Sequence, residues 1–159
     1  MSIEAVREYL SAFGVQDRIL EFEVSSATVE LAAQALGCES KRIAKTLSFM
    51  VESGPVLIVA AGDVKIDNPK FKAQFNCKAK MLTPEQTVAY IGHAVGGVCP
   101  FAVEQGVAVY LDESLRRFDT VFPACGSSNS AIELTLEELE RLARPCGWVD
   151  VCKMREETV

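Results

Sequence analysis

The 159-residue sequence has few of the features that mark membrane or secreted proteins. Its longest clear apolar run, Val56–Ala61, is far shorter than the roughly 18 residues that cross a bilayer. The first residues lack the basic head and apolar stretch of a secretory signal. The chain is 49% hydrophobic and 24% charged, which is typical of globular proteins. We therefore expect a single cytoplasmic domain, residues 1–159, with no membrane contact.

Metal and nucleotide-binding motifs are also missing. There is one histidine, His93, and none of the six cysteines forms a C-x-x-C pair, which argues against a zinc site of the usual spacing. With no export signal, we expect most thiols to be small buried side chains. The phosphate-binding patterns G-x-x-x-x-G-K-S/T and G-x-G-x-x-G are absent. We expect no metal ion and no cofactor.

Positive charge is scarce overall but concentrated in one segment. The chain has 16 basic and 22 acidic residues, a net charge of −6, which argues against a protein that coats nucleic acid. Residues 41–80 nevertheless hold eight of the 16 basic residues and only three acidic ones. Either this segment is a solvated lysine-rich face, or it forms a local rim that attracts a phosphate-bearing ligand.

Hydrophobic periodicity and turn residues predict an α+β fold with a mixed sheet. Apolar residues at helical spacing, with capping residues and glycine or proline at the ends, predict helices over 3–13, 29–36, 69–75, 84–91 and 136–144. Alternating or continuous apolar runs predict strands over 19–23, 44–51, 56–61, 78–82, 107–111, 119–123, 130–134 and 148–151. Residues 44–51 and 56–61 form a hairpin in this interpretation.

Two glycine-bearing loops are candidate ligand-binding segments. Gly96 and Gly97, followed by Pro100, make a tight loop whose backbone N–H groups can bind a carboxylate, a phosphate or an oxyanion. The second loop, residues 123–130, is rich in small and hydroxyl side chains. Each pattern is also typical of an ordinary turn, so spacing alone does not decide between the two.

Two single side chains are further candidates. Lys45 opens a strand of otherwise buried residue types, so it either extends its ammonium into water or places a cation at a pocket mouth. No second lysine or cofactor motif supports a Schiff base. His93 precedes the first glycine loop, but no serine or cysteine partner for a hydrolytic triad is evident. A lone histidine is more often structural.

Several segments, in order, resemble the YbaK/prolyl-tRNA-synthetase-associated domain family, the aminoacyl-tRNA editing domains. The matching segments run from about residue 20 to residue 144 and are 28–37 (TVELAAQALG), 43–47 (IAKTL), 95–101 (VGGVCPF), 109–112 (VYLD), 124–126 (ACG), and 132–134 (IEL) with the helix that follows. Each is modest alone, but the ordered set is specific.

The resemblance implies a mixed, largely antiparallel sheet curved around a pocket with peripheral helices. It also implies hydrolysis of the ester that joins a mischarged amino acid to tRNA, and it assigns roles to residues. Lys45 falls on the family's functional lysine and is the predicted catalytic residue. The predicted substrate-binding residues are Gly96, Gly97, Val98, Cys99, Pro100 and Gly126, with Thr46, His93, Ser127 and Asn129 as further candidates.

Two residues depart from the family's commonest pattern. Cys99 stands where serine is frequent, which changes one donor near the loop. Asn129 stands where many members have a second glycine. Because asparagine tolerates the left-handed region, we expect this turn to survive.

The leading hypothesis is a free-standing deacylase for mischarged tRNA, with tRNA(Pro)-type editing favoured. The resemblance implies attack by water or by the substrate's own groups, without a protein nucleophile. The expected partners are the acceptor end of tRNA and an aminoacyl-tRNA synthetase. One alternative is a non-catalytic module that binds an aminoacyl-adenosine-like ligand or docks on a synthetase. Another is a thiol-based redox protein, which would need an acidic, exposed cysteine.

Overall fold

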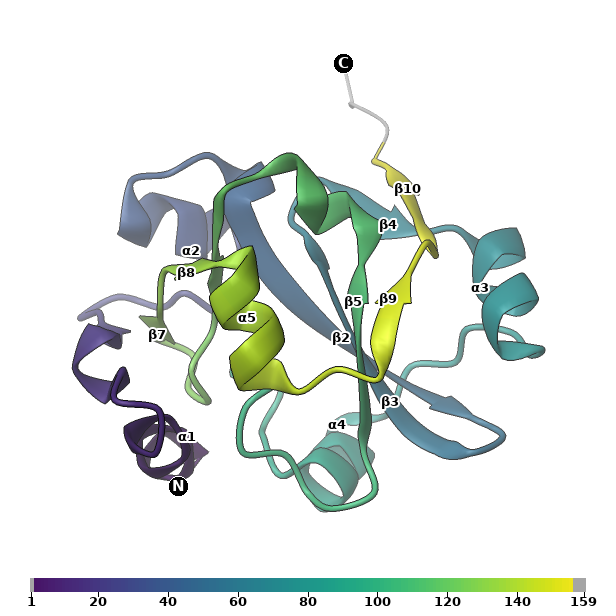
Figure 1. The fold of residues 1–159 in the computed structure, drawn as a ribbon, viewed down its shortest axis with the longest axis horizontal. Helices are drawn as coiled ribbons and strands as arrows, with labels where there is room; N and C mark the ends of the chain where they lie inside the picture. The colour runs from purple at the N-terminus through teal and green to yellow at the C-terminus, as the bar shows by residue number, and fades with distance from the viewer. Residues whose placement is uncertain (1, 156–159) are drawn as a thin grey trace.

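Two long neighbouring strands form the centre of the sheet. The computed structural model describes residues 2–155, and in it β2 (Ile43–Val51) pairs antiparallel with β3 (Gly54–Ala61) (Figure 1). This confirms the predicted hairpin. Residues 56–61 of β3 are almost fully buried, which fits a run of apolar residues covered on both faces of a sheet.

Shorter strands extend the hairpin into a six-stranded mixed sheet. Its order is β8 (Leu134–Thr135), β6 (Thr120–Pro123), β2, β3, β5 (Ala108–Asp112) and β9 (Gly147–Val149). Two separate pairs are β1 (Leu20–Glu21) with β7 (Ser130–Ala131), and β4 (Val64–Ile66) with β10 (Cys152–Met154). Among residues 2–155, four of the seven strand pairs are antiparallel and three are parallel. The predicted fold class is confirmed.

Helices lie around the sheet, as predicted. Figure 1 shows α5 in front of the sheet and α3 at one end of it. The helices are α1 (Ser2–Ser11), α2 (Val29–Leu36), α3 (Asn68–Phe75), α4 (Pro84–Gln86) and α5 (Leu136–Ala143), with single turns η1 (Gln16–Arg18), η2 (Ser40–Arg42), η3 (Thr87–Ile91) and η4 (Glu113–Arg117). None of the helices in residues 2–155 is long and apolar enough to cross a membrane.

Side-chain caps fix the ends of two helices at the predicted residues. The Thr28 Oγ1 accepts a hydrogen bond from the Leu31 N–H at 3.1 Å, and Gly37 ends α2 in the left-handed region at φ 68°. Thr135 and Glu138 form a reciprocal capping box at the start of α5. These local signals are readable from sequence because they need only neighbouring residues.

Some predicted elements differ from the structure. Residues 78–82 are not a regular strand, because only the Met81 bridge to Phe49 and two flanking hydrogen bonds attach this segment to β2. The predicted strand 130–134 is divided into β7 and β8, since the chain changes its partner from β1 to β6 between them. The helix that begins at Pro84 widens into a π-helical turn over η3. Strands β4 and β10 were not predicted.

Two apolar clusters hold these layers together. The larger one surrounds the β2–β3 hairpin and includes the fully buried Phe71, Phe101 and Leu139. A small separate cluster joins α2 to the sheet through Ala32, Ala33, Ile43 and Phe122. The second cluster fixes the first turn of α2 above the beginning of β2, and this arrangement positions the candidate site.

The capping carboxylate of α5 predicts an acid-sensitive contribution to stability. The Arg18 guanidinium bonds Glu138 at 2.5 Å, and with the Thr135 N–H it lowers the pKa of this carboxyl to about 2. A depressed pKa stabilises the folded state above the ordinary value of 4.5, and this contribution is lost as the pH falls towards 2. We expect Glu138→Gln to lower the free energy of unfolding by about 1 kcal/mol at pH 7 and by much less near pH 2.5.

Urea unfolding at both pH values measures this difference. Glu137→Gln is the matched control, because Glu137 is the preceding residue of α5 and is exposed. An equal effect of Glu138→Gln at both pH values would contradict the assigned ion pair.

Candidate functional site

A cavity of about 260 Å³ opens between α2, β2 and the first glycine loop. Its walls come from the start of α2, from residues 43–48 of β2, from residues 81–82 and from the loop at 95–98. Most of the lining is apolar, with Ala32, Ile43, Leu82 and Phe122 among the lining residues. The cavity is slightly smaller than typical small-molecule sites, which are roughly 300–1,000 Å³.

The cavity lies at a gap in the pairing of β2. One edge of this strand pairs with β3 along its length, but the other edge pairs with β6 only at Ile43 and Ala44. Further along the same edge, the Ser48 carbonyl accepts from Leu82 N–H and the Met50 N–H donates to Lys80. Between these contacts no strand or loop within residues 2–155 pairs with the edge.

Thr46 occupies the middle of this gap. In an antiparallel ladder, alternate residues direct both backbone groups to the same side. Because Ser48 and Met50 direct theirs away from β3, Thr46 does the same, and its N–H and C=O face the gap. Its Oγ1 is shielded from solvent and has no hydrogen-bond partner among the described residues. The gap therefore presents unused donors and acceptors beside the cavity.

Lys45 lines the same cavity. Its Nζ donates a hydrogen bond to the backbone carbonyl of Val64 in β4. Burial, followed by the positive charge of Arg155, lowers the pKa of the ammonium. An ammonium has three N–H donors, and one of them is used here. Two remain for a ligand.

The two glycine loops touch each other through their backbones. A Cβ on Gly97 would lie 2.8 Å from the carbonyl carbon of Gly126 and from the Ser127 nitrogen. Gly96 and Gly126 have φ values of 94° and 91°, a region that L side chains rarely adopt. Gly96 and Val98 line the cavity, whereas Gly97 faces the second loop. Glycine is therefore required at 97 by space and at 96 and 126 by backbone conformation.

Several predicted site residues lie behind the cavity wall. His93 is 1% exposed and Cys99 is fully buried, and neither lines the cavity. The His93 Nε2 lies 2.7 Å from the Phe101 carbonyl, which makes Nε2 the protonated nitrogen, and burial lowers the histidine's pKa. Pro100 is buried in the same segment. These residues support the loop from inside.

Ser127 and Asn129 hold the second loop in place. The Ser127 Oγ lies 2.7 Å from Ser130 Oγ, and Asn129 Nδ2 donates to the Phe22 carbonyl at 2.9 Å. Neither residue lines the cavity, and Gly126 does not either. The turn at Asn129 is present, as expected, but its φ is not positive, so the left-handed region is not used there. Its amide instead ties the loop to the segment before α2.

Thiol chemistry has little support in the geometry. The Cys99 Sγ lies 3.6 Å from His93 Nε2, but burial raises the pKa of this thiol to about 12. Burial also raises the pKa of Cys152 to about 12, and that of Cys125 well above its ordinary value. The thiolate is the nucleophilic form of cysteine, so the neighbouring Cys99 and His93 do not make an activated pair.

The sequence reasoning missed residues that the tertiary fold brings to the site. Ser26, Thr28 and Val29 line the cavity at the start of α2, and Phe122 and Thr87 come from other elements. The sequence predicted that Thr28 caps a helix, but no sequence pattern indicated that this helix packs against β2. The Val64 carbonyl reaches Lys45 because the chain turns at residues 62–63, directly after β3.

Comparisons with known proteins identify the family of the chain. The model of the family described as aminoacyl-tRNA editing domain matches residues 23–142. The chain belongs to this family. It is 53% identical to the Bacillus subtilis protein YwhH over 154 residues, covering 96% of this chain and 98% of that protein. It is also 30% identical over 90 residues to proline–tRNA ligase of Thermotoga maritima, covering 56% of this chain and 15% of the ligase.

Solved structures of editing proteins have the same fold. A crystal structure described as a candidate trans-editing enzyme for prolyl-tRNA synthetase superposes with a TM-score of 0.86 at 29% identity. The match covers 96% of this chain and 97% of that one. The curled mixed sheet around the cavity is thus an editing-domain fold rather than a feature of this chain alone.

The contact between the glycine loops predicts that a side chain at position 97 destabilises the fold. We expect Gly97→Ala to lower the free energy of unfolding by about 1–3 kcal/mol, because a Cβ there would meet backbone atoms that cannot rotate away. Thermal or urea unfolding measures it. Gly147→Ala is the matched control, since a Cβ on Gly147 would meet nothing within 4 Å, and we expect a change within about 0.5 kcal/mol. Equal effects of the two substitutions would contradict the close approach.

Proposed function

We propose that this protein, as a single domain over residues 1–159, is a free-standing deacylase for mischarged tRNA. The observation that carries the proposal is the meeting of Lys45, the open edge at Thr46 and the Gly96 loop at one cavity. Membership of the editing-domain family supports the substrate class. The likeness to a candidate trans-editing enzyme for prolyl-tRNA synthetase supports tRNA(Pro)-type editing.

The proposed reaction needs no nucleophile from the protein. A water molecule adds to the ester carbonyl carbon, the bond to the ribose oxygen breaks, and that oxygen leaves with a proton. The products are the free amino acid and the ribose hydroxyl of the tRNA end. An ester is already activated, so orientation and stabilisation of the oxyanion can each lower the barrier by several kcal/mol. The raised pKa of Cys99 is consistent with this mechanism.

Each cavity group has a role in this proposal. The free donors of Lys45 bind oxygen atoms of the acylated ribose end and hold the ester in the cavity. Backbone N–H groups of Gly96 and Val98, the members of this loop that line the cavity beside Val95, orient the ester carbonyl. The Thr46 carbonyl accepts from the α-ammonium of the amino acid, since this carbonyl faces the gap in β2. Gly97, Cys99, His93 and the second loop keep the loop backbone in place.

The size and lining of the cavity favour a small amino acid. A volume of about 260 Å³ must hold the side chain and the ester, and the walls at Ala32, Val98 and Ala124 are apolar. A pocket of this kind excludes large side chains by size, while it separates small ones by only about 1–3 kcal/mol per methylene group. The size limit is therefore the main source of selectivity in this proposal.

A panel of mischarged tRNAs tests the function. We expect release of at least one small amino acid from tRNA(Pro), and no release of phenylalanine or tyrosine, measured as loss of acid-precipitable labelled amino acid. No release from any substrate, at concentrations where a control editing enzyme is active, would contradict the proposal. Stabilisation by a non-hydrolysable aminoacyl-adenosine without turnover would instead support the non-catalytic binding module.

Removal of the Lys45 charge tests its assigned role. We expect Lys45→Met to reduce kcat/KM for the best substrate by about a hundredfold or more, because it removes a charged donor from the cavity and keeps most of the packing stem. Circular dichroism and thermal unfolding check that the variant is folded. Val95→Ala is the control, because Val95 also lines the cavity but supplies only an exposed apolar side chain. Near-normal turnover of Lys45→Met would reject the role.

A further inference from the structure

Two lysines face each other directly across the β4–β10 ribbon. Lys65 of β4 and Lys153 of β10 are register partners in this antiparallel pair, and both are exposed. Side chains of directly opposed residues lie on the same face with Cβ atoms about 4.5–5.5 Å apart, and like charges at such positions are destabilising. Among residues 2–155, neither lysine has an ion-pair partner. Within the described residues, the fold thus keeps two cations together without an ion-pair partner, at a cost in stability.

Three other basic residues of the segment 41–80 form ion pairs, whereas Lys72, Lys78 and Lys80 are exposed and have none among residues 2–155. Lys41 pairs with Glu39 at 3.3 Å, Arg42 with Glu133 at 3.1 Å, and Lys70 with Asp150 at 3.0 Å. The basic segment seen in the sequence is therefore not a uniform cationic face. At the ribbon, Lys65 of this segment lies opposite a second lysine, Lys153, which comes from the other end of the chain.

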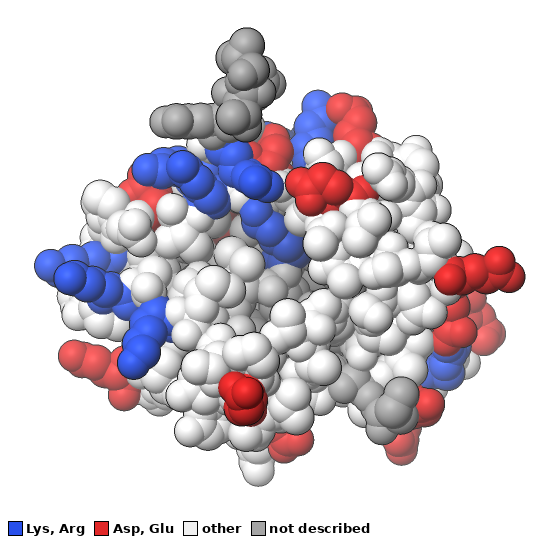
Figure 2. Space-filling model, turned by 180° about the vertical axis from the view of Figure 1, so that it is seen from behind, with Lys and Arg blue, Asp and Glu red and all other residues white. Residues whose placement is uncertain are grey.

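The ribbon is joined to the cavity. The Val64 carbonyl, one residue before Lys65, accepts the hydrogen bond from Lys45 Nζ. At the end of β10, the Arg155 N–H donates to the Asp63 carbonyl, and its guanidinium lies 3.8 Å from Glu30 of α2. Figure 2 shows lysine and arginine side chains gathered along one side of a hollow in this face.

We propose that the β4–β10 ribbon binds the sugar-phosphate backbone of the RNA whose acylated end enters the cavity. The inference rests on the proposed function for the identity of that RNA. Lysine ammonium groups act as point charges towards phosphate, and such contacts fix register without reading sequence. The Lys65 and Lys153 ammonium groups each contact one phosphate, and the negative charge of the backbone removes their mutual repulsion.

Equilibrium binding of RNA tests the ribbon separately from catalysis. The probes are uncharged tRNA(Pro) and a minihelix of its acceptor stem, each labelled for fluorescence anisotropy and titrated over a range of salt concentrations. In the double variant Lys65→Gln/Lys153→Gln, we expect Kd at low salt to rise about tenfold. We also expect the slope of log K against log salt to fall by about two, one for each lost phosphate contact.

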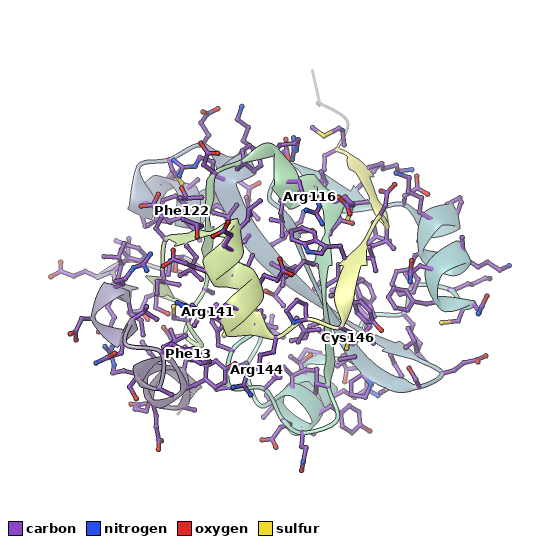
Figure 3. The ribbon with its side chains drawn as sticks, in the orientation of Figure 1. Phe13, Arg116, Phe122, Arg141, Arg144 and Cys146 are labelled. Atoms are coloured by element: carbon purple, nitrogen blue, oxygen red, sulfur yellow. The ribbon has the colours of Figure 1, made fainter. Side chains whose placement is uncertain are left out.

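The control removes the same kind of charge from the opposite face. Arg141 is exposed on α5, which Figure 3 shows on the side turned away from the view of Figure 2. Arg141→Gln should leave Kd and the salt slope unchanged. Because the substituted lysines repel each other, the double variant should unfold at the same temperature as the unchanged protein or slightly higher, which confirms that it is folded.

A substrate without the RNA helix shows whether the two lysines act outside the cavity. If the lysines contact only phosphates outside the cavity, the double variant should hydrolyse an aminoacyl-adenosine at the normal rate while KM for the aminoacyl-tRNA rises. Unchanged RNA binding in the double variant, an equal loss in Arg141→Gln, or no RNA binding by the unchanged protein would each overturn the inference. A tenfold loss of RNA binding together with no turnover of any tRNA would contradict the deacylase and still support the ribbon.

Discussion

The unpaired edge of β2 is the constraint on which the site depends. A strand edge in a sheet normally has its N–H and C=O groups satisfied by a neighbour. Here β6 leaves β2 after Ala44, and residues 80–82 join it only at Ser48 and Met50. The backbone groups of Thr46 are left facing a cavity between these contacts. A ligand with its own donors and acceptors can complete the edge, and this makes the site polar at one wall although most of its lining is apolar.

The glycine loops close the cavity without filling it. Because the backbones of Gly97 and Gly126 touch, the two loops form one wall, and Asn129 and Ser26 tie that wall to the segment before α2. Buried His93 and Cys99 support it from inside the core. Such a wall holds backbone N–H groups at fixed positions, as stabilisation of an oxyanion requires. The residues that do not touch the cavity are therefore as necessary to its shape as those that do.

Local sequence signals predicted the parts of this fold that local interactions determine. The Thr28 and Thr135 caps, the β2–β3 hairpin and the paired glycines could be read from neighbouring residues. The β4–β10 ribbon could not, because each strand has three residues and its partner lies at the opposite end of the chain. The cavity also depends on where β6 separates from β2, which no periodicity encodes. For this reason the sequence predicted Cys99, His93 and Gly96 together as candidates for substrate binding. In the structure Gly96 lines the cavity, whereas Cys99 and His93 are buried behind it.

The distribution of charge is compatible with the proposed binding of RNA by an acidic protein. A net charge of −6 repels a polyanion at long range, so non-specific binding is weak. In the proposed complex, attraction is concentrated at Lys65 and Lys153, whose ribbon is connected to the cavity by the hydrogen bond from Lys45 to Val64. In this proposal, an RNA backbone that contacts the ribbon without placing its end in the cavity gains only a few screened contacts. An acylated adenosine without the RNA helix gains only the contacts in the cavity. If both contacts are needed, as the two proposals together imply, the full affinity requires an acylated end attached to an RNA helix, which is the chemical description of a charged tRNA.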